Sequence, residues 1–487
     1  MDLEVTHLAY DSRRVSEQGL FTAIVGHKTD GHQFIDQALQ KGVRVIVTER
    51  EDYPVPSSVT RIRVKNSREA LSQLAACFYG YPASNLRLVG ITGTNGKTTT
   101  SYLIESILKT AGFSVGVLGT IYYRYGSKIQ TASMTTPESL DLQGLLAEMV
   151  RDGVTHVVME VSSHALDQGR LREIAFDQAV FTNLSQDHLD YHLDMEDYFQ
   201  AKTKLFTHHL KSGGEGIAII NCDDPYGQRI WEARKGPKQD YRLEKSAAYF
   251  PLEIHSGLNG VSGRIKTPHG TYSITSPLIG HYNMSNILAA WAVGEGFKLA
   301  GQTIQKGIEA LASVPGRMEP VPNNLGLTIL VDYSHTPEAL RSALLSIKRH
   351  GQGKILTVFG CGGDRDPHKR PLMGKVAGEL SDLTVVTSDN PRTENPLTII
   401  TQIEEGLKNL PLPVFNGEPL REIPDSPGYV LKPDRREAIA LAISLAQTGD
   451  VVLIAGKGHE TYQLLGRETI HFDDREETRK ALEALNV

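Results

Sequence analysis

The feature that most constrains this chain is the segment LVGITGTNGKTTT at residues 88–100, in which a short apolar strand pattern leads into a glycine-rich loop. Glycines let backbone N–H groups close around phosphate oxygens, and the start of a helix adds further donors. Lys97 can reach the β and γ phosphates of a nucleotide, and the Thr98 hydroxyl can ligate Mg²⁺. The segment therefore predicts a strand, a phosphate-binding loop and a helix in that order.

The loop departs from the pattern G-x-x-x-x-G-K-[ST], because Ile91 stands where the first glycine would be. Its first glycine, Gly93, comes only three residues before Gly96. A glycine-rich turn without a ligand is the alternative, but strand, glycines, Lys-Thr pair and helix coincide here. We therefore predict that the nucleotide is bound by Gly93, Thr94, Asn95, Gly96, Lys97, Thr98 and Thr99.

The composition excludes several classes of protein. With 487 residues the chain is too long for one core, and about 150 residues per domain suggests about three domains. The formal net charge of −6 gives no sign of a nucleic-acid-binding surface. Three widely spaced cysteines argue against a disulfide framework. Without a leader-like start or an apolar run near about 18 residues, we expect a cytoplasmic protein that does not span a membrane.

Strand and helix patterns alternate along the whole chain, which is typical of α/β folds with parallel sheets. In the first part, strand patterns at 43–49 and 60–65 precede a helical pattern at 67–79. In the last part, Thr336 and Pro337 mark the start of a helix that reaches His350.

We predict three α/β domains from this alternation. They are a small N-terminal domain at 1–87, a central P-loop domain with a mainly parallel sheet and flanking helices at 88–315, and a Rossmann-like C-terminal domain at 316–487.

Polar side chains follow two strand patterns of the central domain. Glu160 and Ser162 end the pattern at 156–163, where doubly wound sheets bind ligands, so Glu160 is either a Mg²⁺ ligand or a paired structural carboxylate. His188 and His192 follow the next pattern and are either metal ligands or surface histidines. Spacing alone predicts that Lys202 is solvated.

Three polar loops follow strand patterns in the C-terminal domain, and they contain Arg365, Asp389 and Arg392. The ends of neighbouring parallel strands meet at one edge of a sheet, so these residues are expected to line one pocket. Arginines pair with a carboxylate and acids with an ammonium, which suits a zwitterionic amino acid. The alternative is a set of surface turns that only serve the backbone. Glu460 adds a carboxylate to the same edge.

A nucleotide loop in one domain and an amino-acid pocket in another indicate ATP-driven amide formation. ATP would convert a carboxylate into an acyl phosphate, and Mg²⁺ with Lys97 would neutralise the charge of the transferred phosphoryl group.

The chain resembles the Mur ligase family over nearly its full length. The motifs that carry the resemblance are YDSRRV and GHKTDG, then GTNGKTTT, TTPES, MEVSSHAL and NLSQDHLDYH, then GHYNMSNILAA and PGRME, and finally VDYSHTPEAL, FGCGGDRDPHKRPLMG, SDNPRTENP and AGKGHETYQ.

The resemblance implies roles for residues that spacing alone does not assign. The UDP-sugar substrate would be contacted by Tyr10, Ser12, His27, Lys28, Thr29, Thr135, Thr136, Ser162, Gln168 and Arg170. Met134 stands where the family usually has Asn. Lys202 would be carboxylated to a carbamate that holds one Mg²⁺ with His188, while Thr98 and Glu160 hold another. Further nucleotide contacts would come from Asn283, Arg317, Asp332 and His335.

The resemblance also implies the amino acid that is added. Asp389-Asn390-Pro391-Arg392 is similar to the form found in family members that add meso-2,6-diaminopimelate to the D-glutamate γ-carboxylate of UDP-MurNAc-L-Ala-D-Glu. Together with Arg365, Arg392 can bind the extra carboxylate of diaminopimelate, and Gly456 and Glu460 would receive its ammonium. The implied role is cytoplasmic peptidoglycan precursor synthesis by a monomer, and hence cell-wall biogenesis, cell shape and cell division.

Other hypotheses remain open at the level of the sequence. The same chemistry would serve an L-lysine-adding or a folylpolyglutamate-type ligase. From another class, the chain could be a P-loop ATPase or sugar kinase, or a nucleotide-binding module without catalysis.

Overall fold

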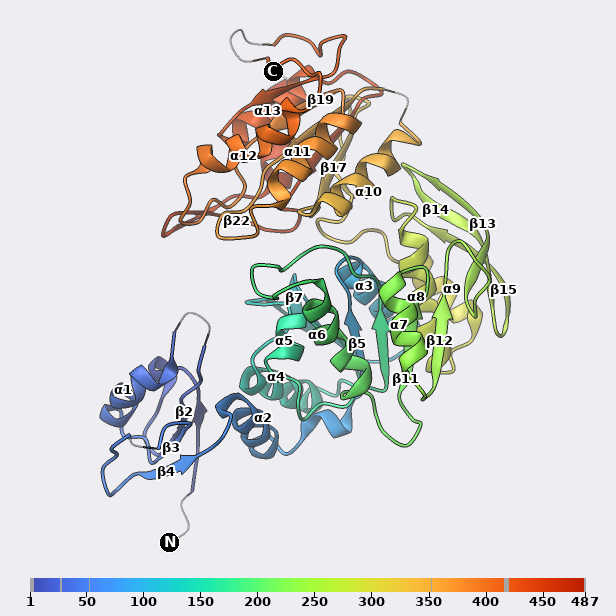
Figure 1. Ribbon diagram of the computed structural model, residues 1–487. Helices are drawn as coiled ribbons and strands as arrows, with labels where there is room; N and C mark the ends of the chain where they lie inside the picture. Colours follow the sequence, from blue (N-terminus) through green and yellow to red (C-terminus); the bar gives the residue numbers. More distant parts are fainter. Residues whose placement is uncertain (1–3, 27–28, 52, 352, 416–419, 486–487) are drawn as a thin grey trace.

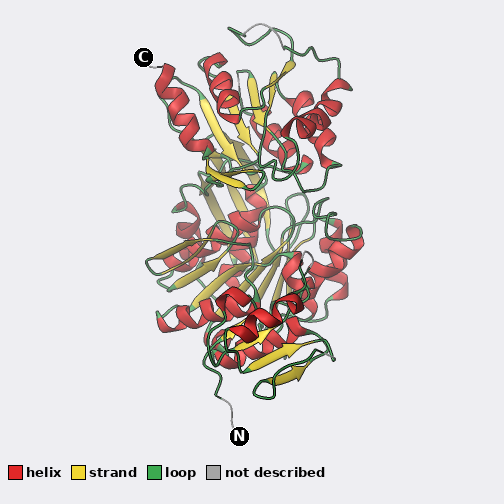
Figure 2. Cartoon of the chain, turned by 90° about the vertical axis from the view of Figure 1, so that its left-hand side faces the viewer, coloured by secondary structure: helices red, strands yellow, loops and turns green. Residues whose placement is uncertain are grey.

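The computed structural model describes residues 4–26, 29–51, 53–351, 353–415 and 420–485. Figure 1 shows three bodies along an elongated molecule, with the N-terminal residues in blue at one end and the C-terminal residues in orange and red at the other. Each body has a sheet with helices beside it (Figure 2). The predicted three-part α/β fold is confirmed, while the boundaries at 87/88 and 315/316 stay a prediction. No helix in the described ranges is long and apolar enough to cross a membrane.

The N-terminal body contains a four-stranded parallel sheet. Its strands, in spatial order, are β1 (Leu8–Ala9), β2 (Leu20–Thr22), β3 (Val45–Thr48) and β4 (Thr60–Arg63). Its helical segments are η1 (Ser12–Arg14), η2 (Gly31–Phe34), α1 (Ile35–Gln40), α2 (Ser67–Phe78) and η3 (Pro82–Asn85). The Asn66 side chain caps α2 by accepting from the N–H groups of Arg68 and Glu69. The strand and helix patterns predicted in this part are confirmed.

The central body is built on an eight-stranded sheet in the order β12-β11-β10-β5-β9-β6-β7-β8. The strands are β5 (Arg87–Thr92), β6 (Val115–Leu118), β7 (Tyr122–Tyr125), β8 (Lys128–Thr131), β9 (His156–Glu160), β10 (Gln178–Phe181), β11 (Ile217–Asn221) and β12 (Lys238–Tyr241). Only β7 pairs antiparallel, with β6 on one side and β8 on the other, so the mainly parallel sheet that the sequence predicts is confirmed.

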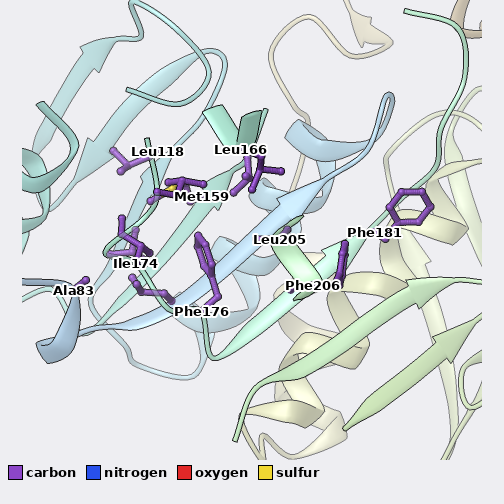
Figure 3. Packing of buried hydrophobic residues seen from close by; sticks show 14 of the residues in the cluster. Ala83, Leu118, Met159, Leu166, Ile174, Phe176, Phe181, Leu205 and Phe206 are labelled. Carbon is purple, nitrogen blue, oxygen red and sulfur yellow. The ribbon is translucent and has the colours of Figure 1, made fainter. Parts of the chain in front are cut away.

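Helices cover both faces of this sheet. They are α3 (Lys97–Thr110), α4 (Ser139–Arg151), α5 (Ser163–Asp167), α6 (Met195–Thr207), α7 (Pro225–Ala233), α8 (Asn283–Gly296) and α9 (Gly301–Glu309). Successive strand residues point to opposite faces, so Met159 and Phe181 pack on one side with α6, as Figure 3 shows, while Val158 and Val180 pack on the other with α3 and α8. The strand that ends in the phosphate loop is therefore held between two apolar layers.

An antiparallel sheet that the sequence did not predict follows the parallel one. It consists of β13 (Phe250–Gly257), β14 (Gly260–Thr267) and β15 (Gly270–Ser276). Its first turn consists of Leu258-Asn259, between the paired residues Gly257 and Gly260. The Ser256 hydroxyl and the His350 ring, 3.0 Å apart, connect this sheet to the C-terminal body.

The C-terminal body has a six-stranded sheet in the order β16-β17-β21-β18-β19-β20, parallel except for the short edge strand β16. Its strands are β16 (Glu319–Pro320), β17 (Thr328–Asp332), β18 (Ile355–Phe359), β19 (Leu383–Val386), β20 (Gly428–Leu431) and β21 (Val451–Ala455). A hairpin of β22 (Tyr462–Leu465) and β23 (Glu468–His471) follows β21.

Helices complete this Rossmann-like body. They are α10 (Pro337–Lys348), α11 (Lys369–Leu380), α12 (Pro396–Lys408), α13 (Arg435–Leu445) and α14 (Asp474–Leu485). Thr336 caps α10 through the N–H of Ala339, with Pro337 in the first turn, as predicted. A buried ion pair fastens α14 to α13, because Nε and Nη2 of Arg435 each lie 2.7 Å from a carboxylate oxygen of Asp474.

We predict that Asp474→Ala lowers the free energy of unfolding of this body by about 3–5 kcal/mol, since Arg435 would keep a buried charge without its counter-ion. Arg436 and Glu477 join the same two helices, but the Arg436 side chain is 60% exposed. As the matched control, Arg436→Ala should cost at most about 1 kcal/mol. Urea denaturation followed by circular dichroism measures both, and equal losses would contradict the assignment.

Candidate active site

The phosphate loop lies at the carboxyl end of β5, the strand between β9 and β10. Gly93 and Gly96 have φ angles of +147° and +86°, and a Cβ on Gly93 would lie 1.9 Å from the Thr182 hydroxyl. Two hydrogen bonds of 2.9 Å fasten the loop to the end of β10, from Thr94 N to Asn183 O and from Asn95 N to Asn183 Oδ1. The loop is therefore held in shape by its neighbours before any ligand binds.

Lysines from two helices meet on one carbonyl of this loop. The Nζ atoms of Lys97 on α3 and Lys202 on α6 each donate to Gly93 O at 2.9 Å. Lys202 is buried, and its Nζ lies 4.5 Å from the centre of the Tyr198 ring. Burial, reinforced by the Lys97 charge, lowers the pKa of Lys202 well below its ordinary value. The expectation of a solvated Lys202 is therefore wrong.

Glu160 ends β9 beside the loop and is buried. Its carboxylate accepts from the Thr98 hydroxyl at 3.0 Å and from the Thr120 hydroxyl at 2.8 Å. A carboxylate and a hydroxyl are oxygen ligands of the kind that Mg²⁺ prefers, and that ion usually takes few protein ligands. The pair therefore fits a magnesium ion bound together with nucleotide phosphates.

The histidines after β10 lie in two different environments. The ring of His192 is buried between the Ser163 hydroxyl at 3.0 Å and the Asp197 carboxylate at 3.2 Å, so its contacts are internal. His188 is more open, with its ring nitrogen 3.4 Å from the carboxylate of Asp187. No cluster of three or more His, Cys, Asp or Glu suited to a metal ion occurs among the residues that the structure describes. A metal at His188 would thus need a further ligand.

A hinge segment brings the C-terminal body to the loop. Nη2 of Arg317 donates to the Thr98 hydroxyl at 3.2 Å, and the same guanidinium stacks 4.5 Å from the centre of the Tyr333 ring. The His335 ring nitrogen lies 3.9 Å from the carboxylate of Asp187. Two residues predicted to contact the nucleotide therefore approach the loop from the other body.

Two other predicted nucleotide residues are already engaged within the protein. The Asp332 carboxylate accepts from the N–H groups of Met318 and Ser334, at 2.7 and 2.8 Å. Asn283 donates to Ile279 O at 2.8 Å. In this arrangement Asp332 shapes the hinge, and its contact with a nucleotide stays a prediction.

Five residues predicted for the UDP-sugar substrate converge beside Glu160. They are Thr135, Thr136, Ser162, Gln168 and Arg170, linked through hydroxyl and guanidinium contacts. Arg170 donates to Thr136 O at 2.9 Å and contacts the Met134 sulfur at 3.0 Å. Glu138, which the sequence did not single out, lies 3.2 Å from Arg170 and 2.7 Å from Arg68. This region therefore presents basic and hydroxyl groups near the nucleotide loop.

The N-terminal candidates lie apart from this group. The Ser12 hydroxyl donates to Gln37 at 2.7 Å, and the Tyr10 hydroxyl donates to Asp141 of α4 at 2.5 Å. Tyr10 thus fastens the N-terminal body to the central one. The backbone carbonyl of Thr29 accepts from Gly26, whereas His27 and Lys28 lie outside the described residues.

Several residues predicted to bind the amino acid lie near one another at the edge of the C-terminal sheet. Asn390 Nδ2 donates to Glu460 at 2.7 Å, and a Cβ on Gly456 would lie 2.6 Å from Asp389 Oδ2. Arg392 follows Pro391 with φ +51°, an unusual value for a residue with a Cβ, and its guanidinium donates to Gly363 O at 2.8 Å.

Arg365 is exposed, and its side chain lies with that of Arg392 beside Gly362. Acids and arginines thus both lie in the loops at this edge of the sheet, and their binding of a zwitterionic amino acid stays a prediction.

Sequence reasoning missed Lys457, which is fully buried between Glu460 and Asn390. The motif Gly456-Lys457-Gly458 follows a strong strand pattern, so Lys457 could have been predicted to lie at this edge of the sheet. The sequence was instead interpreted through Glu460 alone.

The fold and the phosphate loop define a class of nucleotide-binding enzymes in which a C-terminal Rossmann-like body contacts the phosphate loop of a central body. Family models agree with this class, with Mur ligase family, catalytic domain at residues 4–79, Mur ligase middle domain at 91–294 and Mur ligase, glutamate ligase domain at 316–458. The chain belongs to the Mur ligase family.

Individual relatives cover nearly the whole chain. The UDP-N-acetylmuramoyl-L-alanyl-D-glutamate--2,6-diaminopimelate ligase of Geobacter metallireducens is 47% identical over 99% of this chain and 95% of its own length. The enzyme of the same name from Clostridium tetani is 41% identical over 100% and 96%. A solved structure of a ligase with this name has a TM-score of 0.67 at 32% identity and covers 99% of this chain and 96% of that chain.

The shape of the phosphate loop gives a test of its role. We predict that Gly93→Ala weakens binding of a non-hydrolysable ATP analogue by about tenfold or more, because the new Cβ would force the loop away from Thr182. Gly112→Ala is the matched control, since Gly112 also has a positive φ, +85°, but a Cβ there would meet nothing within 4 Å. Titration calorimetry with Mg²⁺ measures both, and unchanged affinity in Gly93→Ala would refute the role.

Proposed function

We propose that this chain is an ATP-dependent ligase that adds meso-2,6-diaminopimelate to the D-glutamate γ-carboxylate of UDP-MurNAc-L-Ala-D-Glu. The observation that carries the proposal is the contact from Arg317 to Thr98, which joins the body with the amino-acid pocket to the nucleotide loop. The names of the relatives that are 41–47% identical over nearly the whole chain support the substrates.

The first step of the reaction would be phosphorylation of the γ-carboxylate. Lys97 and the N–H groups at the start of α3 would bind the ATP phosphates, and Arg317 would approach the same phosphates from the hinge. Thr98 and Glu160 would hold Mg²⁺, which supplies charge neutralisation for the transferred phosphoryl group. The product is an acyl phosphate, in which phosphate is a good leaving group.

The second step would be attack by an amine of the amino acid. The lone pair of the neutral amine forms the C–N bond, phosphate leaves with the C–O bond electrons, and the amine loses a proton. Ser162 and Arg170 would hold the UDP-linked dipeptide so that its γ-carboxylate lies near the loop. Closure of the C-terminal body over the loop would bring the amine to the carbonyl carbon and exclude water.

We also propose that Lys202 acts as a carbamate. A neutral amine reacts with CO₂, and its surroundings favour that form, because Lys202 is buried and its ammonium shares the Gly93 carbonyl with Lys97. The carbamate would supply the oxygen ligand that a metal ion at His188 would need.

We further propose that the protein acts as a monomer in the cytoplasm. One chain contains the phosphate loop, the hinge and the proposed amino-acid pocket, which supports action as a monomer.

The alternative within the family is addition of L-lysine. Lysine lacks the second carboxylate, so Arg392 and Arg365 would be left without an anionic partner in its complex. Because diaminopimelate supplies a second carboxylate to the two arginines and lysine does not, the arginines favour diaminopimelate over lysine.

An amino-acid panel tests the substrate. With UDP-MurNAc-L-Ala-D-Glu, ATP and Mg²⁺, we predict that diaminopimelate supports phosphate release at least about 10³-fold better than lysine, measured as kcat/KM. Arg392→Gln should remove most of this preference. Faster turnover with lysine would reject the substrate, and phosphate release without an amide product in mass spectra would favour an ATPase or kinase.

The state of Lys202 has a separate test. In wild-type protein equilibrated with ¹³C-bicarbonate, we predict a carbamate ¹³C NMR signal. Lys202→Gln should abolish this signal and lower kcat by at least about 10²-fold. Lys204→Gln is the control, because Lys204 lies on the same helix in an exposed pair with Asp167. A wild-type enzyme that is active without the signal would contradict the carbamate.

A further inference from the structure

Lys457 is a buried basic residue to which the reaction described above assigns no role. It follows β21, its side chain is 0% exposed, and its Nζ contacts three oxygens. These are Tyr462 O at 2.5 Å, Glu460 Oε2 at 3.2 Å and Asn390 Oδ1 at 3.4 Å. A substrate cannot reach this ammonium without displacing those groups, so any effect of Lys457 on the substrate passes through its neighbours.

These neighbours join the two loops of the amino-acid pocket into one unit. Asn390 donates to Glu460 at 2.7 Å and accepts from the N–H of Leu464 at 2.9 Å. Gln463 of the β22–β23 hairpin donates to Asp389 O at 2.7 Å. The carboxylate of Glu460 is thereby fixed by two donors on one oxygen, one neutral and one charged.

The two carboxylates of the proposed pocket, Asp389 and Glu460, repel each other when both are charged. Asp389 and Glu460 are both largely buried, and a nearby second carboxylate disfavours the charged form of Glu460. Burial and then the Asp389 charge raise the pKa of Glu460, whereas Lys457 and Asn390 oppose this rise. Other titratable or charged groups that act on this pair are Tyr333, Cys361, Tyr462 and Arg435.

We propose that Lys457 is a positioning residue for the amino-acid substrate, which keeps the Glu460 carboxylate charged and aimed into the pocket to receive the substrate ammonium. The inference rests on the proposed function, since the substrate must carry an ammonium. It assigns the selectivity for a cationic group to a Lys457–Glu460 unit rather than to Glu460 alone.

Kinetics of Lys457→Met give the first test. The KM for diaminopimelate should rise about 10- to 100-fold, because one partner of a buried charge pair is lost. The KM values for ATP and for the UDP-linked dipeptide should stay within about twofold. Lys480→Met is the matched control, because Lys480 pairs with Glu477 on the surface of the same body and is 61% exposed.

The pH profile separates a charge effect from a packing defect. Without Lys457, Glu460 would ionise only at higher pH, so the variant's KM for diaminopimelate should fall as pH rises while the wild-type KM stays nearly constant. A raised KM without this pH dependence would overturn the proposal.

The double variant Lys457→Met/Glu460→Gln provides a second readout in case Lys457→Met does not fold. It removes both charges of the pair, so no buried charge is left without its partner. If Lys457 acts through Glu460, the double variant should match Glu460→Gln in KM within about threefold. A double-variant KM well above that of Glu460→Gln would overturn the inference. Wild-type protein without diaminopimelate-dependent phosphate release would instead reject the proposed function, so the two failures are distinguishable.

Discussion

The rest of the site depends on the close packing of Gly93 against the end of β10. No side chain fits between the loop and Thr182, so the chain turns sharply out of β5 and presents the Gly93 carbonyl to α3 and α6. β5 is central in the sheet, and its neighbours supply Glu160 from one side and Asn183 from the other. The order of three parallel strands thus decides which side chains surround a nucleotide.

The hinge transmits this arrangement to the C-terminal body. Gly316 has φ +63°, and a Cβ there would lie 2.1 Å from His459 N, so the hinge backbone packs directly on the segment that contains Lys457 and Glu460. Tyr333 donates its N–H to Gly316 O at 2.9 Å and stacks on Arg317. The segment that contains Lys457 and Glu460 and the arginine at the phosphate loop are therefore parts of one packed unit, which would move together in the closure proposed above.

Much of this arrangement was predictable because its signals are local. The apolar strand patterns, the Thr336 cap and the polar residues at strand ends depend on a few neighbouring residues and on the rule that parallel strands end at one edge. The β13–β15 sheet was missed, since its strands are only partly buried and lack the continuous apolar runs of the buried parallel strands. The contacts of Tyr10 with Asp141 and of Glu138 with Arg68 join residues more than 60 positions apart, and single-sequence patterns do not encode such pairs.

The two lysines at the Gly93 carbonyl show how binding of a nucleotide, a metal and CO₂ would be linked under the proposed function. In the described arrangement their ammonium groups repel each other while sharing one acceptor, which disfavours the charged form of Lys202. Conversion of Lys202 into a carbamate would replace this repulsion by attraction between Lys97 and an anion. The same change would create a site for a divalent cation, whose binding then stabilises the carbamate in return, as linkage requires. Phosphates that draw Lys97 away from the loop carbonyls would release Gly93 O as well. Under the proposed function, the geometry around one glycine would thus couple the three ligands without any movement of the sheet.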